Sequence, residues 1–134
     1  MPLLDHIGIT VEDLPASAAQ WDPVMREVGL TSRHDADDGV SWSADDGSEI
    51  ILYAPRETGT GPHRHGRVGW QHLAFDVPSR EAVDRLHGIA VGAGWTAVRD
   101  PKPYPRYNER YYASFIEDEN GIRLEFMFNP PREA

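Results

Sequence analysis

The stretch "LDHIGITV" at residues 4–11 decides the fold, together with its counterpart "WQHLAFDV" at residues 70–77. In the first stretch apolar side chains stand at every second position, which is typical of a β-strand with one buried face, and His6 lies on the other face. The second stretch repeats the pattern with His72 in the same place. Because the two segments align without a gap, we interpret them as two copies of one template, each with a histidine opposite its aliphatic residues.

Each of these strands is followed by the signals of a helix. Asp13 and Ser79 are N-cap residues directly after the two strands, and apolar residues then recur at helical spacing up to Gly29 and Gly94. Short strand candidates follow each helix, at residues 40–44 and 49–53 in the first half and at 96–99, 111–116 and 122–128 in the second. Each half is therefore interpreted as a βαβββ module.

The predicted fold class is α+β, with two βαβββ modules forming a cupped mixed sheet and helices on its outer face. The length of 134 residues fits one domain. We expect a single domain over 1–134, made of module one at about 1–55, a linker at 56–68 and module two at about 69–129. Stretches rich in Gly or Pro at 54–69 and 99–110 predict loops, because proline resists helices and central strands.

Composition narrows the class of partner. There are 13 Lys and Arg against 22 Asp and Glu, a net charge of −9, so we expect no nucleic-acid partner. No apolar run approaches the roughly 18 residues of a membrane span, and the N-terminus lacks the regions of a signal peptide. We therefore expect a cytoplasmic protein with no membrane partner. The chain has no cysteine, so any metal must be held by imidazole and carboxylate groups.

A carboxylate joins the two histidines in this interpretation. On the strand predicted at 122–128 the large apolar residues alternate and face the helix, which leaves Glu125 on the same face as His6 and His72. Two imidazoles and one carboxylate are suited to a divalent metal that keeps positions free for substrate oxygens. The alternative is a polar face open to solvent, with Glu125 paired to Arg123 two residues away.

The segments "LDHIGITVEDL", "WQHLAFDVPSR" and "YYASFIEDENGIRLEFM" resemble the vicinal oxygen chelate superfamily, which includes glyoxalase I, extradiol dioxygenases and the fosfomycin and bleomycin resistance proteins. The resemblance covers nearly the whole chain. It implies a cup of paired modules with metal ligands on the first and last strand of each, which suggests His6, His72 and Glu125. It also implies a divalent metal ion (Zn, Ni, Mn or Fe) and a homodimer, in which the ligands come from one chain or from both.

The fourth ligand is where the chain departs from this family pattern. Aligning residues 45–53 with 119–127 by their glycines places Ile51 opposite Glu125. Glu49 has the same parity as Ile51 but lies two residues away, roughly 6.6 Å along the strand. Either Glu49 is the fourth ligand, or it is an ordinary polar residue at the start of a strand. Loss of that ligand would leave two histidines and one carboxylate, as in non-haem iron dioxygenases.

The function expected first is that of a glyoxalase-like lyase or isomerase, which acts on a small substrate with adjacent oxygens while Glu125 or Glu49 transfers a proton. Tyr111 and Tyr112 point in opposite directions, so one of them reaches the cup as a hydrogen-bond donor or proton carrier, and Tyr112 is taken as the candidate. The alternatives are an Fe(II) extradiol-type dioxygenase and a non-catalytic drug-binding resistance protein. In the last case aromatic residues such as Trp42, Tyr53 and Tyr112 would line the cup.

The loops supply further candidates for substrate binding. His63 and His65 could bind a substrate or close over it, or could simply be solvated in their Gly/Pro-rich loop. Arg64, Arg67 and Arg106 could recognise an anionic substrate, or could only cover the surface.

Overall fold

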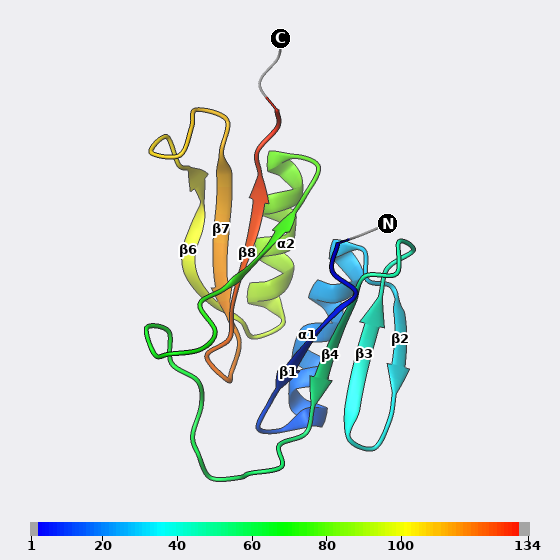
Figure 1. Cartoon of the computed structure of the whole chain (residues 1–134). Helices are drawn as coiled ribbons and strands as arrows, with labels where there is room; N and C mark the ends of the chain where they lie inside the picture. Colours follow the sequence, from blue (N-terminus) through cyan, green and yellow to red (C-terminus); the bar gives the residue numbers. More distant parts are fainter. Residues whose placement is uncertain (1–2, 132–134) are drawn as a thin grey trace. The chain divides into compact units, whose positions relative to one another are not determined.

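The structure is a computed structural model that describes residues 3–131. The chain divides into two compact units, Met1–Pro62 (unit 1) and His63–Ala134 (unit 2), and each is considered by itself below. Each unit is a βαβββ module with one four-stranded mixed sheet and one helix packed against that sheet (Figure 1). The α+β class and the two βαβββ modules predicted from the sequence are confirmed.

Unit 1 has its sheet in the strand order β1-β4-β3-β2. Its elements are β1 (His6–Thr10), α1 (Leu14–Val28), β2 (Ser32–Asp35), β3 (Gly39–Ser43) and β4 (Glu49–Tyr53). β1 is parallel to β4, and the other neighbours are antiparallel. The first strand of the module therefore pairs directly with its last strand, which brings residues from the two ends of the module side by side.

Helix α1 begins and ends where the capping signals predict. A side-chain oxygen of Asp13 accepts a hydrogen bond of 3.1 Å from a backbone N–H of the first turn, and Gly29 ends the helix with a left-handed φ of 115°. The apolar stripe of α1 buries Trp21 completely against the face of the sheet that carries Trp42 and Leu52. The core of unit 1 thus lies between α1 and one face of the sheet, and the other face is left for polar residues.

Unit 2 repeats this arrangement with the strand order β5-β8-β7-β6. Its elements are β5 (Leu73–Asp76), α2 (Arg80–Gly92), β6 (Thr96–Pro103), β7 (Tyr112–Glu117) and β8 (Arg123–Phe128). β5 is parallel to β8, and β8 and β7 are antiparallel. Ser79 caps α2 by accepting a 3.0 Å hydrogen bond from the backbone of Ala82. β8 is a central strand, so its residues have neighbours on both sides.

Strand β2 was not among the strands predicted from the sequence. All four of its residues are exposed, and it lies at the edge of its sheet, where it pairs only with β3. A strand with neither face buried carries no alternation of apolar residues, so the periodicity on which the prediction rests is absent here.

Strand β6 is longer than predicted. The sequence indicated a strand at 96–99 and a loop from 99 to 110, whereas β6 continues to Pro103. β6 is the edge strand of its sheet, so Pro101 and Pro103 break no pairing with a second neighbour. The pairing with β7 is irregular on both sides of Arg99, as expected for a proline-containing edge. Within residues 3–131, no helix is long and apolar enough to cross a membrane.

Candidate functional site

Glu125 in unit 2 is a buried carboxylate with a partner on each oxygen. The residue is 3% exposed. Its Oε1 lies 3.0 Å from Nε2 of His72, and its Oε2 accepts a hydrogen bond of 2.5 Å from the hydroxyl of Tyr111. Burying a carboxylate is costly unless it is paired and hydrogen-bonded, and these two contacts satisfy that requirement. The sequence prediction that Glu125 shares a face with His72 agrees with this contact.

The alternative pairing of Glu125 with Arg123 does not occur. Arg123 points its guanidinium to Glu117, on the neighbouring strand β7, with an Nη2–Oε2 distance of 2.6 Å. Arg123 and Glu117 are directly opposite each other in the register. The surface charges of β7 and β8 therefore satisfy each other and leave Glu125 to its buried partners.

The local sequence explains how His72 reaches Glu125. His72 directly precedes β5, which begins at Leu73 and not at Trp70 as the sequence pattern suggested. The residue opposite Glu125 on β5 is Ala74, whose small side chain leaves room for the imidazole. On the other side of β8 the residue opposite Glu125 is Phe115, and its ring meets the His72 ring edge-on, with centroids 5.5 Å apart.

The two adjacent tyrosines have opposite roles. The Tyr112 hydroxyl donates to Asp84 on α2 at 2.6 Å, with the guanidinium of Arg80 over its ring. It therefore belongs to the helix side of the sheet, and Tyr111 is the tyrosine that touches Glu125. Burial, followed by the hydrogen bond to Glu125, raises the pKa of Tyr111 above its usual value, so its hydroxyl stays protonated and acts as a donor. The structure thus brings Tyr111 into contact with Glu125, whereas Tyr112, the candidate chosen from the sequence, contacts Asp84.

An aromatic cluster that sequence reasoning missed surrounds the Tyr111 contact. Neighbouring ring centroids within it are 5.1–6.1 Å apart, and its members are Tyr104, Tyr107, Tyr111 and Phe115. Tyr104 is 8% exposed, and burial raises the pKa of its hydroxyl. The sequence does contain three tyrosines within "YPRYNERY" at residues 104–111, but the prolines of this region predicted only a loop. These rings provide Glu125 with an apolar neighbourhood.

Unit 1 contains a second pair of histidine and carboxylate. His6 on β1 is directly opposite Glu49 on β4 in the parallel register. Nδ1 of His6 lies 2.7 Å from Oδ1 of Asp5, and this hydrogen bond, with a smaller contribution from the charge of Glu49, raises the pKa of His6. Ser43 donates a long hydrogen bond of 3.4 Å to Glu49. The unit 1 pair is more open than that of unit 2, because the His6 side chain is 53% exposed.

The two pairs differ in register by two residues. Glu125 is opposite Ala74, whereas the residue opposite Gly8, which corresponds to Ala74 in the repeat, is Ile51. The strand pairing therefore agrees with the sequence alignment that placed Ile51 opposite Glu125. Glu49 lies level with its histidine, and Glu125 lies diagonally from its own.

The donor set of unit 2 suits a divalent cation. His72 and Glu125 supply one nitrogen and one oxygen donor 3.0 Å apart, and both are donor types that divalent cations accept. Among the described residues 3–131, neither unit brings three His, Asp or Glu side chains into one metal-binding group. Each unit by itself thus offers one imidazole and one carboxylate.

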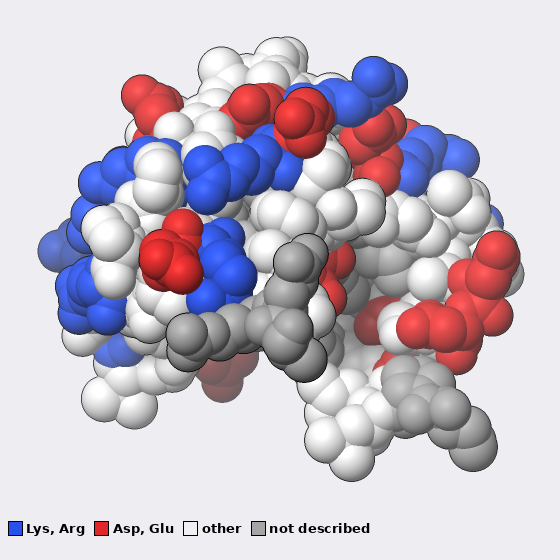
Figure 2. Space-filling view, turned by 90° about the horizontal axis from the view of Figure 1, so that it is seen from above, with Lys and Arg blue, Asp and Glu red and all other residues white. Residues whose placement is uncertain are grey.

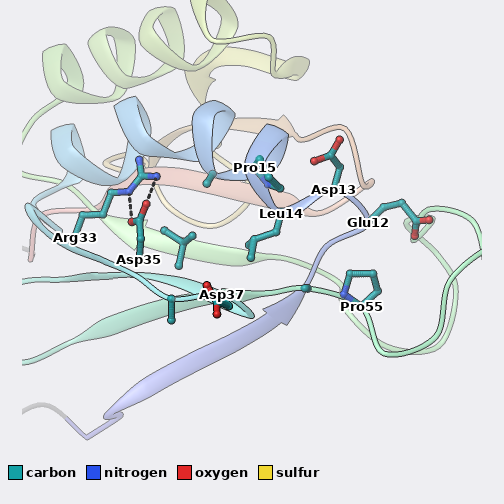
Figure 3. Close-up of a pocket in the computed structure, with 12 residues that line it drawn as sticks. Glu12, Asp13, Leu14, Pro15, Arg33, Asp35, Asp37 and Pro55 are labelled. Carbon is teal, nitrogen blue, oxygen red and sulfur yellow. Dashed lines mark hydrogen bonds and ion pairs between the residues drawn. The ribbon is translucent and has the colours of Figure 1, made fainter.

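A hollow in unit 1 lies apart from these residues (Figure 3). It measures about 740 Å³ and opens beside the start of α1, with Leu14 and Val40 in its apolar lining. Arg33 in its wall is held by Asp35 through two hydrogen bonds, of 2.7 and 3.1 Å. Because its lining comes from the α1 side of the sheet, this hollow does not include His6.

Several other candidates have structural roles. Trp42, proposed for an aromatic drug site, is fully buried and donates to Asp22 at 2.9 Å, so it belongs to the core. Nε2 of His63 lies 2.7 Å from the backbone oxygen of Trp70, and the Trp70 indole in turn donates to the backbone of Arg123. These contacts fasten the segment before His72 to β8, which helps to place that histidine.

Charge is divided unequally between the units. Unit 1 has 12 acidic residues and 3 arginines, whereas unit 2 has 10 acidic and 10 basic residues, so the net charge of −9 lies in unit 1. Figure 2 shows Lys and Arg side chains in several places on the visible face, some of them beside Asp and Glu side chains. The arginines considered for an anionic substrate, Arg64, Arg67 and Arg106, all belong to unit 2, and Arg106 lies over the Tyr107 ring at 5.2 Å.

Comparison with known proteins identifies the class. A family model for the Glyoxalase/Bleomycin resistance protein/Dioxygenase superfamily matches residues 3–126, and the chain belongs to this superfamily. It is 32% identical over 126 residues to the uncharacterized protein YqjT of Bacillus subtilis, covering 92% of this chain and 97% of that protein. It is 30% identical over 133 residues to the uncharacterized protein PA2024 of Pseudomonas aeruginosa, covering 97% and 91%.

A solved structure shows the same fold. The glyoxalase/bleomycin resistance protein from Albidiferax ferrireducens T118 superimposes with a TM-score of 0.77 at 18% identity, covering 96% of this chain and 100% of that one. At this identity the similarity establishes the fold. Proteins of this superfamily bind small-molecule substrates and commonly use divalent metals.

Proposed function

We propose that this chain is a glyoxalase-like metalloenzyme of the lyase or isomerase type, which binds two adjacent oxygens of a small substrate at a divalent metal ion. The observation that carries the proposal is the 3.0 Å approach of His72 Nε2 to the buried carboxylate of Glu125. His72 and Glu125 are the proposed ligands from unit 2, and His6 and Glu49 those from unit 1. Zn, Ni, Mn and Fe all accept such nitrogen and oxygen donors.

The bound metal would act as a Lewis acid that stabilises negative charge developing on the substrate oxygens. Side chains of the protein itself would transfer the proton. Glu125 is the proposed proton carrier, because it is 3% exposed and the proton it holds is shielded from exchange with water. Tyr111 keeps its own proton and donates to Oε2, which orients the carboxylate and leaves Oε1 directed at His72. Glu49 is the second candidate for proton transfer. We also propose that the protein works as a homodimer in the cytoplasm.

The proposal is tested by metal content and metal affinity. Untagged protein is purified, analysed for elements, stripped with a chelator and titrated calorimetrically with Zn²⁺, Ni²⁺, Mn²⁺ and anaerobic Fe²⁺. We expect the wild type to bind one of these ions, and His72→Ala and Glu125→Gln to lose both metal and turnover in a screen of substrates with adjacent oxygens. His34→Ala is the control, because His34 is exposed on the edge strand β2, and it should bind as the wild type does.

Three results would contradict the proposal. A wild type that neither carries nor binds metal would favour the non-catalytic binding protein, and full turnover in His72→Ala would remove that histidine from the chemistry. Oxygen uptake with catechols by the iron-loaded protein would instead assign it to the dioxygenases.

A further inference from the structure

The residue immediately before each histidine contacts Nδ1 of that histidine. In unit 1, Oδ1 of Asp5 lies 2.7 Å from Nδ1 of His6. In unit 2, Oε1 of Gln71 is the hydrogen-bond partner of Nδ1 of His72. The two residues differ in type, length and charge, but both direct a side-chain oxygen to the same ring nitrogen. The same contact made by two different side chains at equivalent places in a repeat indicates a shared task.

The position of these residues at the strand entrances makes the contact possible. Side chains of successive residues within a strand point to opposite faces and do not meet. His6 is the first residue of β1 and His72 directly precedes β5, so Asp5 and Gln71 both lie outside the strands. The backbone there is free of the strand alternation, and a side chain can fold back onto its neighbour.

The contact determines which nitrogen of each ring is offered to a ligand. A carboxylate or carbonyl oxygen only accepts hydrogen bonds, so the nitrogen facing it carries the hydrogen. With Nδ1–H donated in this way, Nε2 of His6 is the atom with the free lone pair. In unit 2, Nε2 of His72 faces Oε1 of Glu125 at 3.0 Å, so a hydrogen lies between these two atoms in the metal-free protein and a bound cation would take its place. The hydrogen bond also restrains rotation of the ring about its bond to the rest of the side chain.

We propose that Asp5 and Gln71 are positioning residues that accept the Nδ1 hydrogens of His6 and His72 and present both Nε2 atoms for metal binding. This inference rests on the proposed function. Outer partners of this kind typically contribute about 10-fold to 100-fold to metal affinity. A residue that merely fills space at the strand entrance would make no such contribution.

The first experiment measures Zn²⁺ affinity by calorimetry. Gln71→Met has similar length but no acceptor oxygen, and we expect it to bind Zn²⁺ about 10-fold more weakly than the wild type or worse. Gln71→Glu keeps an acceptor and should restore the affinity. Asp5→Leu should likewise weaken binding, and Asp5→Asn should retain most of it. Thermal unfolding of the metal-free variants shows whether each one is folded. Unchanged affinity in both Gln71→Met and Asp5→Leu would overturn the inference.

The second experiment needs no metal, and so separates this inference from the proposed function. Nitrogen NMR of the His6 ring in the metal-free protein at about pH 9, where histidines are mostly neutral, reports which ring nitrogen carries the hydrogen. We expect the Nδ1–H form in the wild type and in Asp5→Asn, and its loss in Asp5→Leu. An Nε2–H form in the wild type would overturn the positioning role. Failure of the wild type to bind metal, with the expected ring forms, would contradict the metal-binding part and leave the positioning contact established.

Discussion

Removing the Tyr111 hydroxyl should destabilise the protein more than removing the adjacent hydroxyl of Tyr112. Tyr111 donates at 2.5 Å to a carboxylate that is 3% exposed, and water does not replace a bond lost in such a place. Hydrogen bonds to charged groups contribute about 1.5–3 kcal/mol, so Tyr111→Phe should lose about that much free energy of unfolding. Tyr112→Phe breaks an exposed contact with Asp84, which should cost less than about 1 kcal/mol.

The assay is equilibrium unfolding in urea at neutral pH with a chelator present, followed by thermal unfolding. At roughly 4 °C per kcal/mol, Tyr111→Phe should lower Tm by about 6–12 °C and Tyr112→Phe by less than about 4 °C. Since the pKa of Tyr111 is raised in the folded state, its contribution is complete below the unfolded value of about 10 and declines as the pH rises above it. The alkaline loss of stability should therefore be shallower in Tyr111→Phe. Equal losses in the two variants, or a change below about 0.5 kcal/mol in Tyr111→Phe, would refute this account of the buried carboxylate.

Two further predictions concern a turn and an acid-sensitive contact. Gly47 and Gly121 occupy the hairpin turns of the two modules with φ of 90° and 79°, but a Cβ at Gly121 would lie 1.9 Å from the backbone oxygen of His63 while one at Gly47 would meet nothing. In urea unfolding, Gly47→Ala should lower the free energy of unfolding by about 1–2 kcal/mol and Gly121→Ala by about 2–5 kcal/mol. Equal losses would show that the backbone at His63 moves away to make room for the new Cβ. Burial opposes ionisation of Asp22, but hydrogen bonds from Trp42 and two arginines outweigh it and lower its pKa. The ionised Asp22 therefore stabilises the fold above its unfolded pKa of about 3.8, and this stabilisation is lost as the pH falls below that value. In Asp22→Asn, Tm should fall less steeply than in the wild type between about pH 4 and pH 2. Curves of Tm against pH that run parallel for the two proteins would contradict this.

The elements with one buried face could be predicted from the sequence, because burial forces periodicity. The starts of both helices could be predicted for a different reason. Asp13 and Ser79 are N-cap residues, and each satisfies a backbone donor of the first turn. Strand β2 was missed because neither of its faces is buried, and the end of β6 was missed because an edge strand tolerates Pro101 and Pro103. Pairing with a neighbour stabilises these two strands, and pairing leaves little trace in the sequence of a strand.

The site could be predicted only as far as strand parity reaches. The alternation of side chains along a strand predicted that Glu125 shares a face with His72. It also predicted that Tyr111 and Tyr112 point in opposite directions. It could not decide which tyrosine faces the carboxylate, because both faces of β7 accept an aromatic ring. The contact of Gln71 with His72 escaped prediction for a different reason, since it depends on backbone outside a strand, where the alternation of faces no longer holds.

The two-residue offset between the carboxylates gives the two modules different environments for the same pair of groups. Glu125 lies on a central strand, one residue from two fully buried neighbours, Leu124 and Phe126, and is covered by the rings around Tyr111. Glu49 begins its strand beside a histidine whose side chain is 53% exposed. A proton held by a carboxylate in water exchanges with solvent, whereas one held in an apolar enclosure can be returned to the molecule from which it came. Of the two carboxylates proposed for proton transfer, the environment therefore favours Glu125, while the open position of Glu49 is better suited to a ligand that solvent can reach.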